Sequence, residues 1–213
     1  MQQMHDYNEM SWKEEFWNAI THGIGFIASI PITVLLIIHA TSLNSPVHIV
    51  TYSIFGASLM LLFLMSTLLH SMPPKYKRFF AILDHSSIYV LIAGTYTPFV
   101  LIAVGGWLGI TLLCVVWGIA LFGVVFKCYF IDRFEKLSLA LYIVMGWLII
   151  FAFKPVYLHL QLDGIFVLVA GGLLYTFGSI FYMWRSLPYS HVIWHLFVLA
   201  GTGCMIYCVA VFL

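Results

Sequence analysis

Seven apolar runs, separated by short polar breaks, limit what this chain can fold into. The runs are 17 to 25 residues long, and an α-helix needs about 17 to 25 apolar residues to cross the hydrocarbon core of a bilayer. They cover residues 17–41, 48–71, 79–103, 107–127, 137–153, 162–184 and 189–212. We therefore predict one all-α domain over residues 1–213, a seven-transmembrane helix bundle.

Composition supports the membrane class and excludes others. Of 213 residues, 63% are hydrophobic and 8% are charged, whereas soluble domains carry about 25% charged residues. The formal net charge is +1, so no strongly basic face favours a nucleic-acid partner. None of the 4 cysteines belongs to a CxxC pair, so neither a disulfide framework nor a thiolate metal site is predicted.

The breaks between the runs carry turn chemistry. Gly105 and Gly106 interrupt the least marked boundary and predict a tight turn between the third and fourth helices. Lys154 and Pro155 predict the break between the fifth and sixth helices.

Basic residues predict the orientation, because Lys and Arg accumulate in the cytoplasmic loops of membrane proteins. With seven spans, only Lys154 lies on the side opposite the amino terminus. The amino terminus is therefore expected in the cytoplasm and the carboxyl terminus outside. The other basic residues share the side of the amino terminus: Lys13, Lys75, Lys77, Arg78, Lys127, Arg133, Lys136 and Arg185.

Polar and ionisable residues gather at one depth of the predicted bundle. Such residues are costly in hydrocarbon and usually mark a site or a pathway. Four spans bring them within about 10–15 Å of the cytoplasmic face. They are Glu14, Glu15, Asn18 and His22 of the first span, Ser66 and His70 of the second, Asp84, His85 and Ser86 of the third, and His191 and His195 of the seventh.

The chemistry that these side chains support together is metal binding. His191 and His195 are four residues apart, a spacing that lets two imidazoles on one helix reach the same ion. His70 supplies a third nitrogen. Three imidazoles and an open fourth position form the ligand set of a catalytic zinc ion (Zn2+), whose bound water has a pKa of about 7. Asp84 is expected to act as general base on that water, with Ser66 steadying the water, Asp84 or a substrate carbonyl.

The remaining polar residues have a second interpretation. Histidines near a membrane interface often pack or contact headgroups instead of binding metal. Glu14, Asn18 and His22 share one helix face and are candidates for hydrogen-bonding around the ligands. Capping of the first helix or bonding across the bundle is the interpretation we favour for this face, and for His22 the two interpretations weigh equally. His85 points about 100° away from Asp84 on a helix, so it is a reserve candidate only.

These motifs together resemble the bacterial hemolysin III family, within the larger group of progestin and adipoQ receptors and, more remotely, alkaline ceramidases. The resemblance covers essentially the whole chain. It rests on Glu14-x-x-x-Asn18-x-x-Thr21-His22, Ser66-x-x-x-His70, Asp84, Gly94-Thr95-Tyr96-Thr97-Pro98 and His191-x-x-x-His195. It implies a multi-pass protein of the bacterial plasma membrane, with zinc bound by His70, His191 and His195 near the cytoplasmic side and a water held by Asp84.

Three functions follow from this combination. The first is a zinc-dependent hydrolase of membrane lipid amides or esters, its partner an acyl chain or a ceramide-like substrate, as the resemblance implies. The second is a non-enzymatic sensor or homeostasis factor in which zinc ties helices together, although structural zinc normally has four protein ligands. The third is a cytolytic pore, which normally needs polar residues through the whole depth of the membrane. Here we expect the polar groups to stop about one third of the way across.

Overall fold

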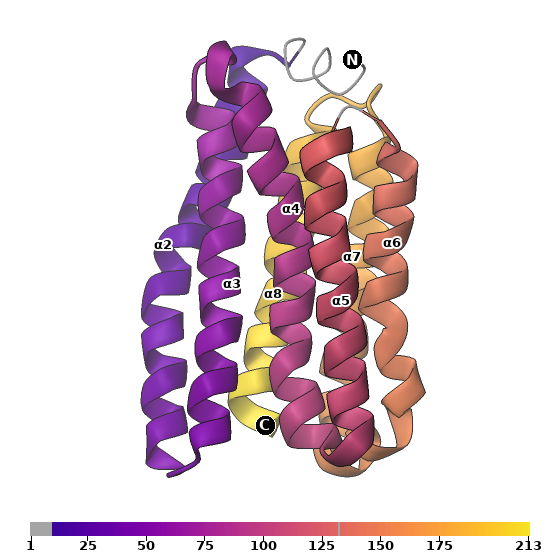
Figure 1. Ribbon diagram of the computed structural model, residues 1–213. Coiled ribbons are helices and arrows are strands. Elements are labelled where there is room, and N and C mark those ends of the chain that lie inside the picture. The colour runs from indigo at the N-terminus through magenta and orange to yellow at the C-terminus, as the bar shows by residue number, and fades with distance from the viewer. Residues whose placement is uncertain (1–9, 132) are drawn as a thin grey trace.

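The computed structural model describes residues 10–131 and 133–213, which are helical with short connections and contain no strand. The helices run side by side along the long axis of the molecule (Figure 1). In chain order they are α2 (Trp12–Ser42), α3 (Pro46–Ser71), α4 (Pro74–Pro98) continued by the π-helical η1 (Phe99–Val104), α5 (Gly106–Phe130), α6 (Glu135–Trp147) continued by the 3-10 helix η2 (Leu148–Ala152), α7 (Phe153–Met183) and α8 (Ser190–Phe212).

Six segments of the described chain are long and apolar enough to cross a membrane. One of them, Glu135–Met183, has 49 residues, and a straight helix of that length would extend about 74 Å, far beyond a hydrocarbon core of about 30 Å. The backbone leaves the helical conformation at Gln161, with φ of 56°. Figure 1 accordingly draws α6 and α7 as separate neighbouring columns. An integral membrane bundle of helices is therefore confirmed.

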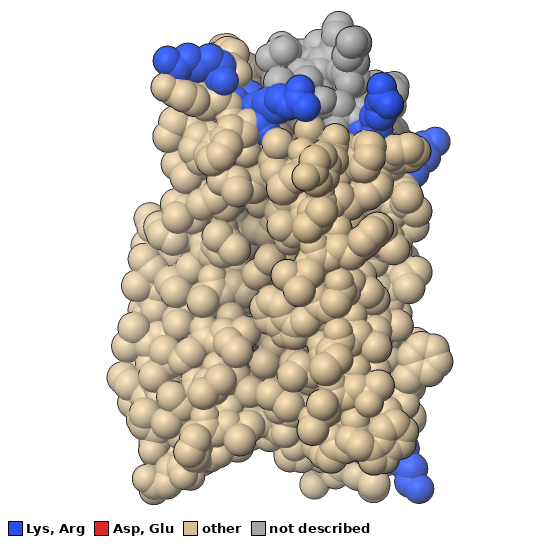
Figure 2. All heavy atoms as spheres, in the orientation of Figure 1, with Lys and Arg blue, Asp and Glu red and all other residues tan. Residues whose placement is uncertain are grey.

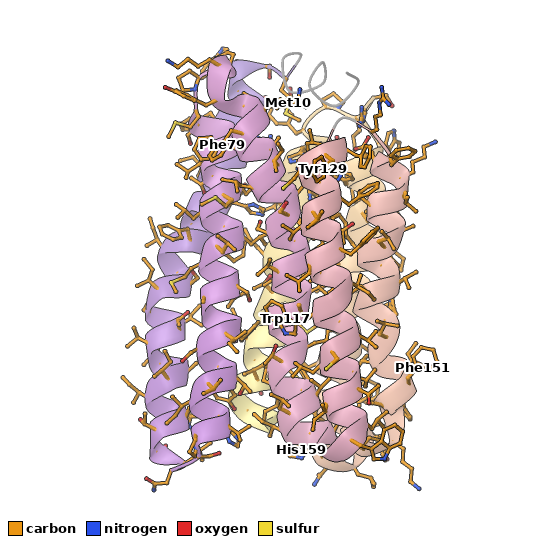
Figure 3. The ribbon with its side chains drawn as sticks, viewed as in Figure 1. Met10, Phe79, Trp117, Tyr129, Phe151 and His159 are labelled. Carbon is orange, nitrogen blue, oxygen red and sulfur yellow. The ribbon has the colours of Figure 1, made fainter. Side chains whose placement is uncertain are left out.

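The surface between the two ends of the bundle is apolar. Figure 2 shows Lys and Arg gathered at the end where α2 begins, with one basic side chain at the opposite end and none on the flank between. Exposed aromatic side chains lie near both ends, among them Phe79, Tyr129 and Phe151 (Figure 3). This distribution is typical of a surface that contacts lipid, with aromatic residues at the interfaces.

Helix α2 buries its small and polar residues and exposes its large apolar ones. Ile24, Ile27 and Leu35 are all more than 60% exposed. Without a hydrophobic force between helices in lipid, small and polar residues at the contact let helices approach closely and bond. The buried face is Asn18, His22, Gly25, Ser29, Thr33, Leu36 and Ala40, a spacing of three or four residues that follows one side of a helix.

The predicted turn at Gly105 is confirmed, whereas the predicted break at Lys154 and Pro155 is wrong. Gly105 and Gly106 have φ of 62° and 57°, and α5 starts there. Lys154 and Pro155 lie in the first turn of α7, where proline is tolerated because the first helical N–H groups have no partner in the helix. The departure from helical geometry comes later, at Gln161.

Candidate metal centre

Three histidines from two helices converge at the end of the bundle where α2 begins. One ring nitrogen of each of His70, His191 and His195 lies within 4.8 Å of the others. Ring centroids are 5.1 Å apart for His70 and His191, 5.2 Å for His70 and His195, and 4.6 Å for His191 and His195. The i,i+4 pair stands on the first turns of α8, and His70 stands on the last turn of α3. The structure thus brings together the residues that sequence analysis selected as ligands.

The donor set fits zinc by chemistry and spacing. Nitrogens that bind one zinc ion at about 2.1 Å in tetrahedral geometry lie about 3.4 Å apart. The 4.8 Å limit is an upper bound on the nitrogen separations, so binding of one zinc ion requires each separation to shorten by at most about 1.4 Å. Imidazole is a preferred zinc ligand, and three protein ligands leave a fourth position for water or substrate.

Helix α2 orients two of the three rings without contributing a ligand. His70 Nδ1 lies 2.8 Å from Glu15 Oε2, and a carboxylate only accepts, so Nδ1–H is the donor. His195 Nδ1 lies 3.2 Å from the carbonyl oxygen of Asn18 and 3.1 Å from Thr21 Oγ1. In both rings the proton on Nδ1 leaves Nε2 with the lone pair that a metal requires. Glu15 also pairs with Lys77 Nζ at 2.8 Å, which ties α4 to the same carboxylate.

A second polar chain lies directly beside the histidines. His22 stacks on His195 with centroids 3.6 Å apart and planes 8° from parallel. Its Nδ1 lies 2.7 Å from Ser66 Oγ. Asp84, the buried acid selected from the sequence as general base, lines the same cavity as Ser66, His22 and His195.

The structure gives Glu14 the contacts of its capping interpretation and, among the described residues, no hydrogen bond to the three histidines. Its carboxylate bonds Ser11 in a capping box at the start of α2 and accepts the backbone N–H of Tyr189 at 2.9 Å. This is the interpretation in which Glu14 caps the helix and bonds across the bundle. The acid that contacts a predicted ligand is its neighbour Glu15, which sequence analysis did not select.

His85 lies beside Asp84 but turns away from the three histidines. Its Nδ1 lies 2.8 Å from the carbonyl oxygen of Ala81 and its Nε2 lies 3.2 Å from the hydroxyl of Tyr182. The ring therefore spans α4 and α7 instead of joining the His70, His191 and His195 group.

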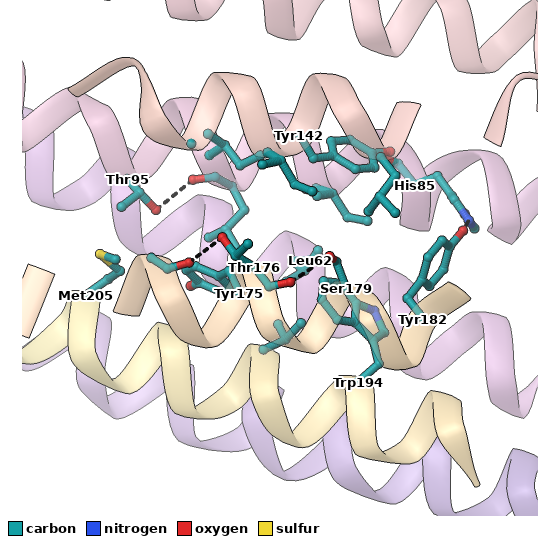
Figure 4. Close-up of a pocket in the computed structure, with 18 of the residues that line it drawn as sticks. Leu62, His85, Thr95, Tyr142, Tyr175, Thr176, Ser179, Tyr182, Trp194 and Met205 are labelled. Atoms are coloured by element: carbon teal, nitrogen blue, oxygen red, sulfur yellow. Dashed lines mark hydrogen bonds between the residues drawn. The ribbon is translucent and has the colours of Figure 1, made fainter. Parts of the chain in front are cut away.

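A cavity of about 150 Å³ adjoins the cluster and extends among α4, α6, α7 and α8 (Figure 4). Most of its length is apolar, with Leu62, Ile88 and Val198 among the lining residues. At one end it is polar. The residues at that end are His22, Ser66, Asp84, His85, His191 and His195. An elongated apolar molecule with a polar head matches this distribution of chemistry.

Comparison with known proteins agrees with the resemblance drawn from the motifs. A family model described as "Haemolysin-III related" matches residues 10–206. "Hemolysin-3" of Bacillus cereus is 54% identical over 198 residues, which cover 92% of this chain and 90% of that protein. "Hemolysin-3 homolog" of Bacillus subtilis (strain 168) is 54% identical over 198 residues, with 92% and 93% covered.

A more distant relative is the human "Monocyte to macrophage differentiation factor", which is 28% identical over 170 residues, covering 75% of this chain and 69% of that protein. The family match extends from α2 into α8, so it contains every helix that carries a residue of the cluster. The chain is a multi-pass membrane protein and belongs to the haemolysin III-related family.

Proposed function

We propose that this protein is a zinc-dependent hydrolase of membrane lipid amides or esters. The observation that carries the proposal is the junction of two features: three histidine nitrogens within 4.8 Å of one another, and an apolar cavity whose polar end contains two of those histidines together with Asp84. A site of this kind can hold an acyl chain in the cavity and the acyl carbonyl beside the histidines.

His70, His191 and His195 would hold the ion. When bound, zinc acts as a Lewis acid, polarising a carbonyl and making a water more acidic. Asp84 would take the proton from the attacking water and return it to the leaving nitrogen or oxygen. The reaction adds one water across the acyl bond, so a fatty acid and an amine or alcohol are released. Ser66, which lines the same cavity as Asp84, would steady the water or the substrate carbonyl.

The same proposal places seven crossings in the bacterial plasma membrane, with the amino terminus in the cytoplasm. The break at Gln161 supports seven crossings because it divides the 49-residue segment into two. The gathering of Lys and Arg at the end where α2 begins (Figure 2) supports a cytoplasmic position for that end. The cluster would then lie near the inner leaflet.

Two variants test the proposal. Asp84→Asn is expected to retain zinc, measured by elemental analysis of purified protein, but to lose release of fatty acid from lipid amides and esters. His191→Ala is expected to lose both. Turnover by Asp84→Asn equal to that of wild type would reject the assigned chemistry. Zinc retained in wild type without any turnover would instead favour the non-enzymatic sensor, and leakage of small solutes from protein-containing liposomes would favour the pore.

A further inference from the structure

Hydroxyl groups line the cavity farther from the histidines than the sequence led us to expect. We expected polar groups to stop about one third of the way across the membrane, and this is wrong. Thr202 stands near the middle of α8, seven residues or about 10 Å beyond His195 along the helix axis. Figure 4 shows Thr95, Tyr175 and Thr176 toward the end of the cavity away from His85 and Tyr182.

Most of these deep polar groups are explained by contacts between helices. Trp147 Nε1 donates to Thr176 Oγ1 at 3.1 Å, and Thr176 donates to the carbonyl oxygen of Gly172 at 2.8 Å. Thr95 donates to the carbonyl oxygen of Leu91 at 2.8 Å. Interhelical and intrahelical bonds of this kind are how polar side chains are normally accommodated in hydrocarbon. They account for every proton on these three side chains.

The pair formed by Tyr175 and Thr202 is not explained in this way. Their hydroxyl oxygens are 2.9 Å apart, and either can be the donor. Two hydroxyls hold two protons, and one mutual bond uses only one of them. Within residues 10–131 and 133–213, neither hydroxyl forms a second side-chain hydrogen bond. An unused donor in a low-dielectric interior is unfavourable, so an acceptor inside the cavity would stabilise it.

Tyr175 is the member of the pair that lines the cavity, whereas Thr202 does not line it and is 2% exposed. When Thr202 donates to Tyr175, the phenol proton is free to bond an occupant. Thr95 also lines the cavity. Its hydroxyl donates to the carbonyl oxygen of Leu91, and its oxygen lone pairs can still accept a hydrogen bond. A ligand hydroxyl, which accepts one bond and donates another, matches this combination.

We propose that the cavity selects lipids whose acyl chain carries a hydroxyl group near its middle, with Tyr175 donating to that oxygen and Thr95 accepting from it. This inference rests on the proposed function, because the hydrolase proposal fixes which end of the lipid lies at the histidines. The separation of about 10 Å along α8 between His195 and Thr202 sets the position of the chain hydroxyl well away from the carbonyl.

Binding of free fatty acids tests chain selection without requiring turnover. The affinities of purified protein for 10-hydroxystearate and for stearate are compared, with and without added zinc. One hydrogen bond of ordinary strength predicts a roughly threefold to tenfold preference for 10-hydroxystearate. Tyr175→Phe is expected to abolish the preference while stearate still binds. Thr95→Val is expected to reduce it, which keeps the test usable if Tyr175→Phe does not fold.

Tyr52→Phe is the matched control. Tyr52 is fully buried, its hydroxyl donates to the carbonyl oxygen of Val209 at 2.9 Å, and it does not line the cavity. The preference should survive in this variant. Equal affinities of wild type for the two fatty acids, or a preference that persists in Tyr175→Phe, would overturn chain selection while leaving the hydrolase intact. If neither fatty acid binds, both proposals are overturned.

Discussion

Replacing Glu15 with glutamine should weaken zinc binding although Glu15 is not a ligand. The carboxylate accepts the Nδ1–H of His70 at 2.8 Å and pairs with Lys77 at 2.8 Å. Outer hydrogen bonds of this kind, which orient a ligating histidine and raise its basicity, typically change metal affinity 10- to 100-fold when removed. We therefore expect the dissociation constant for zinc to rise about 10- to 100-fold, or about 1.4–2.7 kcal/mol.

The assay is competition between purified protein and a chelator of known zinc affinity. Glu14→Gln is the matched control, because the neighbouring acid bonds Ser11 and Tyr189 instead of a ligand, and its dissociation constant should stay close to that of wild type. Folding is checked by thermal unfolding of each variant in detergent.

A second variant separates orientation of His70 from the loss of an ion pair. The side chain of Lys77 is only 8% exposed, and a nearly buried ammonium without its partner destabilises a protein. The double variant Glu15→Gln/Lys77→Met removes that ammonium, so it should recover stability but not zinc affinity. The role assigned to Glu15 would be refuted if Glu15→Gln bound zinc as tightly as wild type. It would also be refuted if the double variant fully recovered the zinc affinity of wild type.

Three further perturbations test the packing and the metal. Gly123→Ala should cost about 1–3 kcal/mol of stability, because a Cβ there would lie 2.5 Å from a ring carbon of the fully buried Tyr89. Gly118→Ala should be neutral or slightly stabilising, because no atom lies within 4 Å of its Cβ. Equal midpoints of thermal unfolding for these two variants would contradict this. Lys127→Met should raise the midpoint, since the Lys127 ammonium is fully buried without a hydrogen-bond partner in the described chain; a lower midpoint would show that the charge is stabilising. A zinc chelator should lower the midpoint of wild type but not of His191→Ala, because a ligand that binds only the folded state stabilises it; no shift in wild type would count against the metal.

The sequence predicts well how deep a residue lies in the membrane, but predicts poorly how a helix is rotated about its own axis. Length and hydropathy place His70 and the α8 pair at one level of the membrane, and the structure brings their nitrogens within 4.8 Å. Which side of α2 faces them depends on helix rotation, which is set by packing against neighbouring helices. Glu14 and Glu15 differ by about 100° in direction, so the rotation of α2 decides which of them contacts His70. The i,i+4 and i,i+8 spacing of Glu14 with Asn18 and His22 made Glu14 a candidate, whereas no spacing singled out Glu15.

Backbone contacts were also beyond the reach of residue patterns. Asn18 was selected for its side chain, yet its backbone carbonyl oxygen is the atom that contacts His195. Its side-chain nitrogen Nδ2 lies 3.6 Å from Met10 Sδ. Any residue offers a carbonyl, so no pattern of side chains indicates this contact. Residue patterns also do not indicate that the break lies at Gln161. Lys154 and Pro155 are equally compatible with a loop and with a first helical turn.

The contacts of α2 give a physical reason for the clustering of polar residues at its start. Glu15 orients His70 of α3 and holds Lys77 of α4, while the Asn18 carbonyl and Thr21 orient His195 of α8. One helix end thus contacts rings on both histidine-bearing helices. The proposed ligand set is divided between those two helices, so it keeps its geometry only if their relative position is fixed. Hydrogen bonds from α2 to both helices fix that position more directly than apolar packing does. A shift of α2 should therefore disturb metal affinity even with all three ligands intact.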